Sequence, residues 1–295
     1  MQCPGHAEDV SFSTTQVLMV ASAPLLMVAV SLFERRWGPK VAGMVAAAPI
    51  TAFVGLLLVR FDIGEGSSHD MAMRMSGYIP AQLGIAVILA ALVGRVGMFR
   101  SLVGGTMTYA CLAWIAALLP TQVAIVASLF LLAAGRLLVT APDAPDVTDR
   151  PAVIGRSRMI ALRAGVSLIT AIGLLLIAHQ FGPSAGGAVG AFPIFTVTLC
   201  MFIYANAGQL GVRQALGGMV QSLPAYFGFV LTYGITTPRL GTVGGSVAST
   251  VVCTSCYLLL HKESSAHAHR DMSTHPQPEP DAQQASAITV TESRG

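Results

Sequence analysis

Residues 38–50 read GPKVAGMVAAAPI, and residues 182–194 read GPSAGGAVGAFPI. The two segments begin 144 residues apart, a distance called the repeat spacing, and are identical at seven of thirteen positions. The same spacing, without a gap, pairs Pro80 with Pro224, Ala81 with Ala225, Val103 with Val247 and Thr106 with Thr250. Self-similarity at a fixed spacing reports how a fold is assembled. We therefore predict that two copies of one unit build this chain.

The sequence around both segments has the composition of a membrane protein. Of 295 residues, 54% are apolar and only 11% are charged, and the mean hydropathy is +0.67. A soluble domain of this length needs more charge to cover its surface. A helix needs roughly 20 mostly apolar residues to cross about 30 Å of hydrocarbon, and such runs recur along the chain. The sequence predicts an all-α polytopic membrane protein.

The apolar runs predict nine transmembrane helices. They lie at 15–33, 41–59, 79–96, 101–119, 121–139, 159–178, 185–205, 218–236 and 241–260. A cleaved secretory signal has Lys or Arg before its apolar run. No Lys or Arg precedes the first run here, so we retain it as a span. The repeat spacing pairs spans one to four with spans six to nine and leaves the fifth as a linker.

This pairing predicts the domain organisation. We expect a short extracytoplasmic N-terminus at 1–14, a first four-helix repeat at 15–119, a linker helix at 120–139, a cytoplasmic loop at 140–158, a second four-helix repeat at 159–260 and a disordered cytoplasmic tail at 261–295.

The distribution of Lys and Arg predicts the orientation. With the N-terminus outside, fourteen of the seventeen Lys and Arg residues fall on the cytoplasmic side, and only Arg60, Arg74 and Arg239 fall outside. Basic residues are retained on the cytoplasmic side of membranes. Because five spans separate the copies, the second enters from the opposite side, which makes the repeat inverted. We expect a multi-pass protein of the inner (plasma) membrane with a cytoplasmic C-terminus.

The second copy resembles a known family. GAVGAFPIFTVTLCMFIY (187–204), followed by SLPAYFGFVLTYG (222–234), is similar to the small four-helix inner-membrane proteins of the GlpM-like type, in which a Gly-rich span ends in a Phe-Pro pair and a Pro-aromatic span follows. The first copy departs from this pattern, with Ala48 in place of Phe192. The resemblance implies a tandem fusion of such units, with an architecture similar to the drug/metabolite transporter superfamily.

Matched prolines are the first candidate site residues. Pro49 and Pro193 lie within apolar spans, where each removes a backbone hydrogen bond and leaves a carbonyl without its usual donor. In lipid, that carbonyl needs a partner or a cavity. The prolines therefore indicate either a polar patch on a substrate path or ordinary bends. Pro80 and Pro224 form the second matched pair.

Small residues four apart predict where helices approach closely. Gly43 with Ala47, and Gly187 with Ala191, occupy equivalent positions of the two copies. Small residues at this spacing bring helix backbones together in membranes. We predict that spans two and seven form the central pair.

Polar side chains near the prolines are the other substrate candidates. Gln82 and Gln221 lead, because an amide that faces lipid is costly. The remaining candidates are Tyr78, Tyr204, Tyr226 and Asn206. Aromatic residues near span ends also serve as interfacial anchors, so this alternative stays open for each tyrosine. For Ser76 and Thr196, a local bond to their own helix backbone is an alternative.

Acidic residues do not occur in the interior of any predicted span. This disfavours proton-coupled export of cationic drugs, which generally requires an intramembrane carboxylate. Charged and titratable residues cluster in the predicted loop between spans two and three: Asp62, Glu65, His69, Asp70 and Arg74. This loop is expected to form either a gate or an ordinary solvated connection. Arg163 either snorkels to the interface or, facing inward, favours an anion.

These features favour a permease or exporter that moves a neutral or anionic small metabolite by alternating access. The alternative is a non-transporting scaffold or biogenesis protein. We predict no enzyme, because no HExxH motif and no intramembrane acid or base is present. No cofactor or metal is expected, and His267, His269 and His275 are assigned to a solvated tail. Expected partners are the substrate and the lipid bilayer, with no nucleic acid, and a homodimer is left open.

Overall fold

A computed structural model describes residues 36–138 and 185–274, together with single positions between 161 and 180. Side chains are described as far as residue 134 in the first range and residue 260 in the second. Several predictions lie outside these residues, namely the span at 15–33, most of the span at 159–178 with Arg163, the loop at 140–158, and the histidines of the tail.

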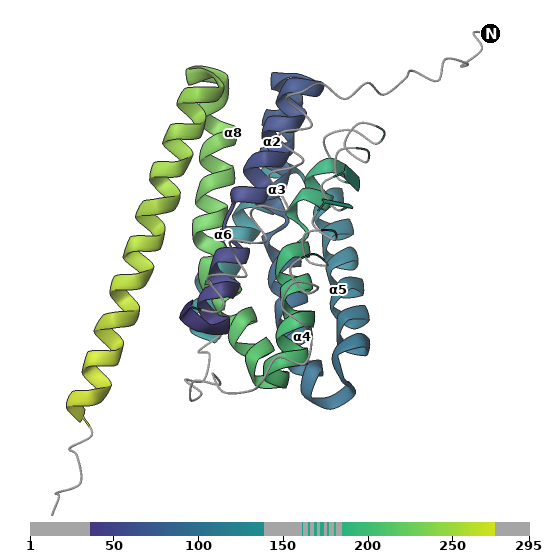
Figure 1. The fold of residues 1–295 in the computed structure, drawn as a ribbon. Coiled ribbons are helices and arrows are strands. Elements are labelled where there is room, and N and C mark those ends of the chain that lie inside the picture. The colour runs from purple at the N-terminus through teal and green to yellow at the C-terminus, as the bar shows by residue number, and fades with distance from the viewer. Residues whose placement is uncertain are drawn as a thin grey trace, which may run out of the picture. The chain divides into compact units, whose positions relative to one another are not determined.

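Every element in the described ranges is helical (Figure 1). The helices are α2 (Ile50–Asp62), α3 (Glu65–Gly77), α4 (Ile79–Val96), α5 (Met98–Leu118), α6 (Thr121–Leu138) and α8 (Ile194–Thr274). Shorter helical segments occupy residues 36–46 and 185–191. Three helical stretches of the described chain are long and apolar enough to cross a membrane: Ile79–Val96, Met98–Leu118 and Ala185–Leu260. The prediction of an all-helical chain suited to a membrane is confirmed.

The helix bounds can be compared with the predicted spans. The predicted span at 79–96 coincides with α4, and those at 101–119 and 121–139 match α5 and α6 within about three residues. Figure 1 shows α4 and α5 side by side, joined at Gly97. They pack closely because Gly105 lets the Ile85 side chain approach its backbone.

The predicted loop between spans two and three is wrong, because residues 65–77 form α3. Its buried residues recur at helical spacing: Ser68, Met71, Ala72, Met75 and Ser76. Charged and polar residues near its start lower the hydropathy, although the buried face is continuous. Residues 206–217, also predicted to lie between spans, belong to α8. Polar and charged residues therefore lowered the hydropathy of two segments that are helical.

Glycines with positive φ separate some of the helices of the described chain. Four of them are Gly64 (122°), Gly97 (81°), Gly208 (68°) and Gly241 (68°). Glycine lacks a Cβ and takes such angles at no steric cost. The repeat spacing pairs Gly64 with Gly208 and Gly97 with Gly241. The backbone thus changes direction at equivalent positions of the two repeat copies.

Between these glycines lie two long helices. The first long helix is residues 65–96, which comprise α3 and α4 joined through the single residue Tyr78. The second long helix is residues 209–240 of α8, which contain Pro224 and Pro238. At about 1.5 Å per residue each is about 48 Å long, more than the hydrocarbon core of a bilayer.

The core is built from the inner faces of these helices. Its largest fully buried side chains are Tyr78, Tyr233, Leu56, Met71, Met75, Ile79, Ile85, Leu89, Leu199, Ile203 and Met219. Large apolar side chains such as Trp114, Phe130 and Val243 are exposed on outward faces, as expected of helices whose solvent is lipid. The compact unit ends at Thr254, and residues from Ser255 form a second unit.

Candidate functional site

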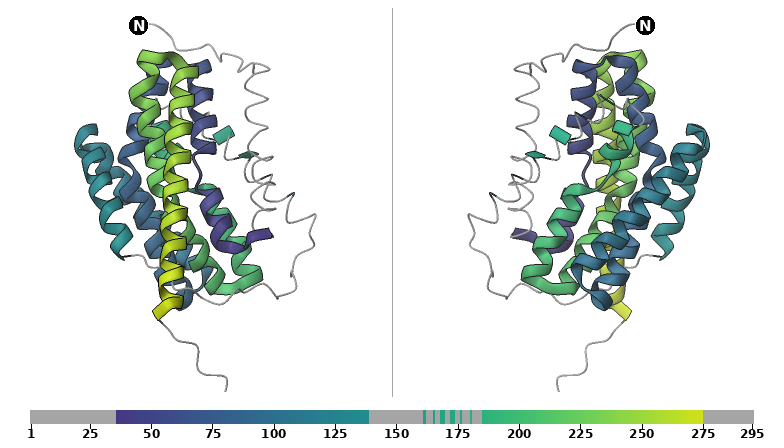
Figure 2. Two further views of the ribbon diagram at one scale, coloured as in Figure 1. Left: turned by 90° about the vertical axis from the view of Figure 1, so that its left-hand side faces the viewer. Right: turned by 90° about the vertical axis from the view of Figure 1, so that its right-hand side faces the viewer.

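Two helices are interrupted at equivalent positions. Residues 36–46 are separated from α2 by a break at 47–49 (Figure 2), and residues 185–191 are separated from α8 by a break at 192–193. Pro49 and Pro193 each precede the second half-helix. A proline lacks an N–H and its ring clashes with the carbonyl four residues earlier, so it kinks or breaks a helix, and these two prolines lie at breaks.

The hydrogen bonds at the two breaks are equivalent. The Ala48 amide donates to the Val45 carbonyl at 3.1 Å, and the Phe192 amide donates to the Val189 carbonyl at 3.1 Å. Beyond each break, the Phe53 amide donates to the Pro49 carbonyl at 2.8 Å, and the Val197 amide donates to the Pro193 carbonyl at 2.9 Å. Each donor and acceptor at the second break is related to its counterpart at the first by the repeat spacing.

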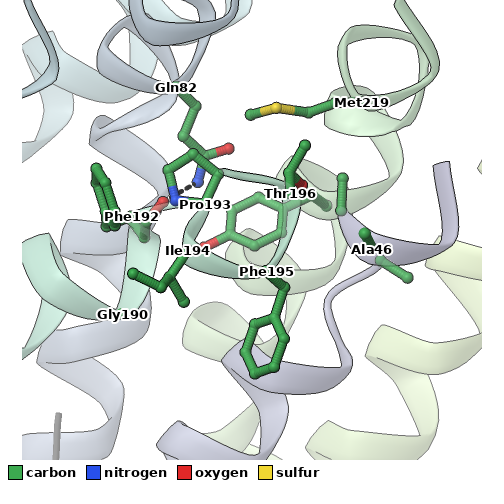
Figure 3. A pocket seen from close by; sticks show the side chains of 13 residues that line it. Ala46, Gln82, Gly190, Phe192, Pro193, Ile194, Phe195, Thr196 and Met219 are labelled. Carbon is green, nitrogen blue, oxygen red and sulfur yellow. Dashed lines mark hydrogen bonds between the residues drawn. The ribbon is translucent and has the colours of Figure 1, made fainter. Parts of the chain in front are cut away.

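Residues from both breaks line one cavity of about 30 Å³ (Figure 3). This volume has room for about two water molecules. The lining residues are Ala46, Ala47, Ala48, Gln82, Gly190, Ala191, Phe192, Pro193, Ile194, Phe195, Thr196, Met219 and Tyr226. None of these described lining residues is charged. In the described part of the chain, no group of His, Cys, Asp and Glu is arranged to hold a metal ion.

The lining residues come largely in equivalent pairs. Four pairs are related by the repeat spacing: Ala46 and Gly190, Ala47 and Ala191, Ala48 and Phe192, and Gln82 and Tyr226. Each repeat copy therefore supplies its break and the middle of its long helix to the same cavity.

Side chains donate to two of the carbonyls that the second break leaves without their usual amide donors. Gln82 Nε2 donates to the Ala191 carbonyl at 2.6 Å, as Figure 3 shows. The Tyr109 hydroxyl, from α5, donates to the Ala188 carbonyl at 2.6 Å. The Tyr109 ring also packs edge-on against Phe192, with ring centroids 4.9 Å apart. The end of helix 185–191 is thus capped by two side chains of the other copy.

Two hydroxyl groups at the cavity have no hydrogen-bond partner. Thr196 is 1% exposed and Tyr226 is 6% exposed, and neither hydroxyl oxygen is paired. The Tyr226 hydroxyl faces the Gln82 side chain, but the contact lacks the geometry of a hydrogen bond. Ser76, in contrast, donates to the Ala72 carbonyl of its own helix at 3.0 Å. Thr196 does not make the local bond that was the alternative for it.

The structure brings some of the predicted site residues together. Gln82, Tyr226 and Pro193 line the cavity, as do the predicted packing residues Ala47 and Ala191. The other predicted site residues lie elsewhere among the described elements: Pro49 is buried at the first break, Pro80 lies in the first turn of α4, Gln221, Pro224 and Tyr204 are half-buried in α8, Tyr78 is buried between α3 and α4, and Asn206 is half-buried before Gly208.

The glycines predicted to pack helices do so across the two copies. A Cβ on Gly43 would collide with the Ala215 backbone of the second long helix. A Cβ on Gly187 would lie 3.4 Å from the Met71 carbonyl of the first long helix. Met71 and Ala215 are related by the repeat spacing. Each interrupted helix therefore packs on the long helix of the other copy, and the two contacts are reciprocal.

The two long helices run antiparallel to each other. His69 Nδ1 donates to the Gly234 carbonyl at 2.6 Å, which joins the start of the first long helix to the end of the second. Arg213 Nε donates to the Ala90 carbonyl at 3.2 Å, which joins the start of the second to the end of the first. The repeat spacing relates Arg213 to His69 and Gly234 to Ala90. These contacts are reciprocal as well.

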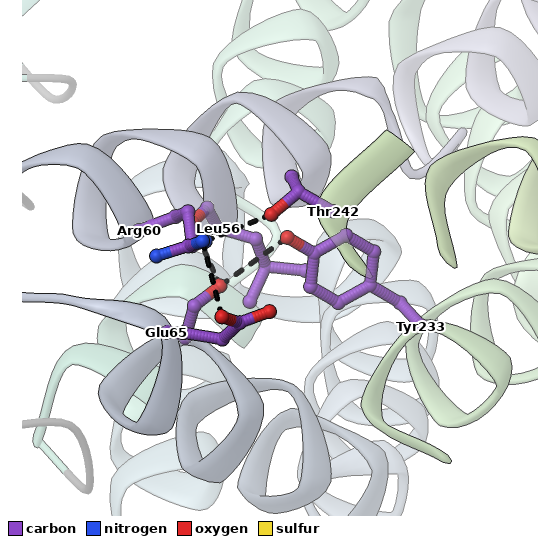
Figure 4. Close-up of polar contacts among 6 residues, drawn as sticks. Leu56, Arg60, Glu65, Tyr233 and Thr242 are labelled. Carbon is purple, nitrogen blue, oxygen red and sulfur yellow. Dashed lines mark hydrogen bonds and ion pairs between the residues drawn. The ribbon is translucent and has the colours of Figure 1, made fainter. Parts of the chain in front are cut away.

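A polar cluster lies where the first long helix begins (Figure 4). Arg60 contacts Glu65 at 3.1 Å and donates to the Thr242 hydroxyl at 2.8 Å. The Ser68 hydroxyl donates to the Leu56 carbonyl at 2.9 Å and lies 3.4 Å from the Tyr233 hydroxyl. Glu65 and His69, predicted to lie on a loop, thus belong to a helix that is tied to the second copy.

Comparison with protein-family models, curated proteins and solved structures finds no match for this chain. The resemblance to GlpM-like units therefore stays a prediction. The proposals below rest on the geometry of the chain itself.

Proposed function

We propose that this chain is a membrane permease or exporter that moves a neutral or anionic small molecule by alternating access. The observation that carries the proposal is the cavity shared by two interrupted helices, one from each repeat copy. Interrupted helices at the interface of two repeats are a recurring place for transporter substrate sites. Irregular backbone at membrane depth is tolerated where it lines such a cavity.

The reciprocal contacts support an inverted repeat. Equivalent helices that run antiparallel are related by a two-fold axis perpendicular to their length. The two long helices meet this condition through the matched contacts of His69 and Arg213. If both long helices cross the bilayer, the axis lies in the membrane plane. We propose the arrangement of four helices, a linker helix and four inverted helices, with nine spans, an outer N-terminus and a cytoplasmic C-terminus in the inner membrane.

The same contacts support two alternating gates. Gln82 lies between His69 and Ala90 in the sequence of the first long helix, and Tyr226 lies between Arg213 and Gly234 in the second. Because the helices are antiparallel, the contact at His69 lies on one side of the cavity and the contact at Arg213 on the other. Breaking one contact while the other holds would expose the cavity to one face of the membrane.

Disulfide cross-links at the two contacts test this mechanism. In a background in which the five native cysteines are replaced by Ala, one double variant carries His69→Cys with Gly234→Cys, and the other carries Ala90→Cys with Arg213→Cys. We expect purified protein in liposomes to accelerate the flux of a solute from a panel of small neutral and carboxylate compounds, measured by light scattering. Oxidation of either pair should then abolish the flux, and a reducing agent should restore it.

The four single-cysteine variants are the controls, and oxidation should leave their flux unchanged. Full flux with either cross-link formed would contradict alternating access. Absence of flux across the whole panel would contradict transport.

The small size of the cavity favours one alternative, a non-transporting scaffold whose repeat only builds a stable bundle. A cavity of about 30 Å³, with room for about two waters, also suits a packed centre. The scaffold predicts that a cysteine at Ala46 or Gly190 stays unlabelled by a membrane-impermeant thiol reagent from both sides. If the protein is a carrier, the reagent should label these cysteines. A cross-link at one gate should then restrict labelling to reagent added on the opposite side of the membrane.

A further inference from the structure

Hydrogen-bond donors without acceptors line the cavity. The second half-helix begins at Ile194, whose amide donates to the Phe192 carbonyl at 2.8 Å, and the Val197 amide donates to the Pro193 carbonyl at 2.9 Å. The amides between them, of Phe195 and Thr196, belong to the first turn, where a helix supplies no acceptor. The side chain of Thr196, in the same turn, is buried and its hydroxyl is unpaired, and so is the hydroxyl of Tyr226 across the cavity. Buried polar groups are normally paired, so these hydroxyls indicate a ligand.

Three carbonyls at the second break, which could otherwise accept hydrogen bonds from a ligand, are already occupied. At the end of helix 185–191, the Ala188 and Ala191 carbonyls accept hydrogen bonds from Tyr109 and Gln82. The Val189 carbonyl accepts one from the Phe192 amide. The negative end of this half-helix is therefore largely neutralised, whereas the positive end that begins at Ile194 faces no acidic side chain among the lining residues. This break offers donors to a ligand and few acceptors.

We propose that this cavity binds a small monovalent anion, held by the first turn of α8 and by the hydroxyls of Thr196 and Tyr226. This inference rests on the proposed function and narrows its substrate from a neutral or anionic molecule to an anion. No lining residue carries a charge of either sign, so the partial charges decide between the two: an anion meets the donors of the first turn of α8, whereas a cation meets few free acceptors at this break. The volume of about 30 Å³ limits the ligand in this conformation to an ion such as a halide or formate.

The test compares two probes of equal size and different charge. Purified full-length protein in lipid nanodiscs is titrated calorimetrically with sodium formate and with formamide, at constant ionic strength set with a bulky anion. Formate should bind at least about tenfold more tightly, because hydrogen bonds to a charged acceptor are the stronger ones. Thr196→Val and Tyr226→Phe should each weaken formate binding by about tenfold.

Matched controls lie on the same helix. Thr198→Val and Tyr233→Phe remove buried hydroxyls that do not line the cavity, and they should leave formate affinity unchanged. The melting temperature without ligand should be unaltered in Thr196→Val and Tyr226→Phe, because neither hydroxyl has a partner to lose.

The binding measurement and the flux measurement can contradict the anion site and the transport proposal independently of each other. Equal affinities for formate and formamide, or formate affinity that withstands both cavity substitutions, would overturn the anion site whatever the flux shows. Formate binding that depends on both hydroxyls, in a protein without any flux, would support the site and contradict the transport proposal. Flux of neutral solutes without formate binding would support transport and overturn the anion site.

Discussion

The breaks at 47–49 and 192–193 share two matched backbone hydrogen bonds and differ in their surroundings. Both include a proline at their end, and both close with an amide-to-carbonyl bond of 3.1 Å. At the second break, Gln82 and Tyr109 cap the exposed carbonyls. The repeat spacing relates these two residues to Tyr226, whose hydroxyl is unpaired, and to Cys253, which is buried.

Features shared by both breaks are those that the repeated backbone needs, and features found at only one break are candidates for binding a ligand. Proline and small residues occur at both breaks because the backbone path depends on them. The side chains that reach the breaks differ, since the fold does not depend on symmetry there. The polar groups gather at the second break, and that is where we place the ligand. Three predictions test how far the two copies differ, beginning with the largest effect.

The two packing glycines should differ most in stability. In Gly43→Ala, the new methyl group would collide with backbone atoms of Ala215, so two helices must separate. We expect a loss of more than about 2 kcal/mol in the free energy of unfolding, as for overpacked cores. In Gly187→Ala, the nearest atom is Arg74 Cβ at 3.2 Å, and the helix propensity gained, up to about 1 kcal/mol, offsets the tight contact.

Denaturant titration of the purified variants in detergent measures both changes. Gly66→Ala is a suitable reference, because no atom lies within 4 Å of its Cβ position. Equal losses in Gly43→Ala and Gly187→Ala would show that the two copies pack with the same tolerance, against this prediction.

The second prediction concerns the side chains that cap the carbonyls. Gln82→Leu leaves the Ala191 carbonyl without its donor, and Tyr109→Phe does the same to Ala188. An unpaired buried group costs about 1 to 3 kcal/mol, and we expect each variant to lose stability within that range. Tyr226→Phe breaks no hydrogen bond, so its stability should stay within about 0.5 kcal/mol of the parent.

The same titration checks this contrast between equivalent positions. Because Gln82 and Tyr226 are related by the repeat, each serves as the other's control. A loss in Tyr226→Phe as large as that in Gln82→Leu would mean that the Tyr226 hydroxyl has a structural partner, and it would remove the main argument for a ligand.

The sequence predicted several parts of this site for physical reasons. Pro193 stood out because proline interrupts an apolar helix, and Gln82 stood out because an amide in such a helix needs a partner. Both line the cavity. The repeat spacing, read from identities around Gly43 and Gly187, recurs in the backbone at the positive-φ glycines. These features depend on residue type and spacing, which a sequence displays directly.

Other parts depend on which helices meet, which no local pattern reports. Tyr109 was missed, because a lone tyrosine in an apolar helix gives no sign of the carbonyl it reaches in the other copy. For Thr196 the sequence offered a bond to its own helix backbone as the alternative, because that is a common role of a helical threonine. At the start of a helix, however, the threonine hydroxyl has no preceding helical carbonyl to accept its bond, and the break puts Thr196 there. The charges of α3 concealed a buried helix face.

The smallest effect is expected at the outer ends of the long helices. Arg60 and Glu65 form an ion pair at 3.1 Å with side chains 30% and 42% exposed, whereas their counterparts, Tyr204 and Gln209, are uncharged. Exposed ion pairs contribute about 0 to 1 kcal/mol, and salt screens them. Glu65→Gln, which copies the residue of the second repeat, should change the free energy of unfolding by less than about 0.5 kcal/mol.

Titration at low and high salt separates this pair from a structural contact, because only a screened pair loses its contribution in salt. A larger, salt-independent loss would show that the Arg60 contact to Thr242, together with Glu65, fixes the two copies to each other at this end. The first copy would then have a stabilising contact between the copies that the second lacks, and the contact at His69 would be the harder of the two gates to open.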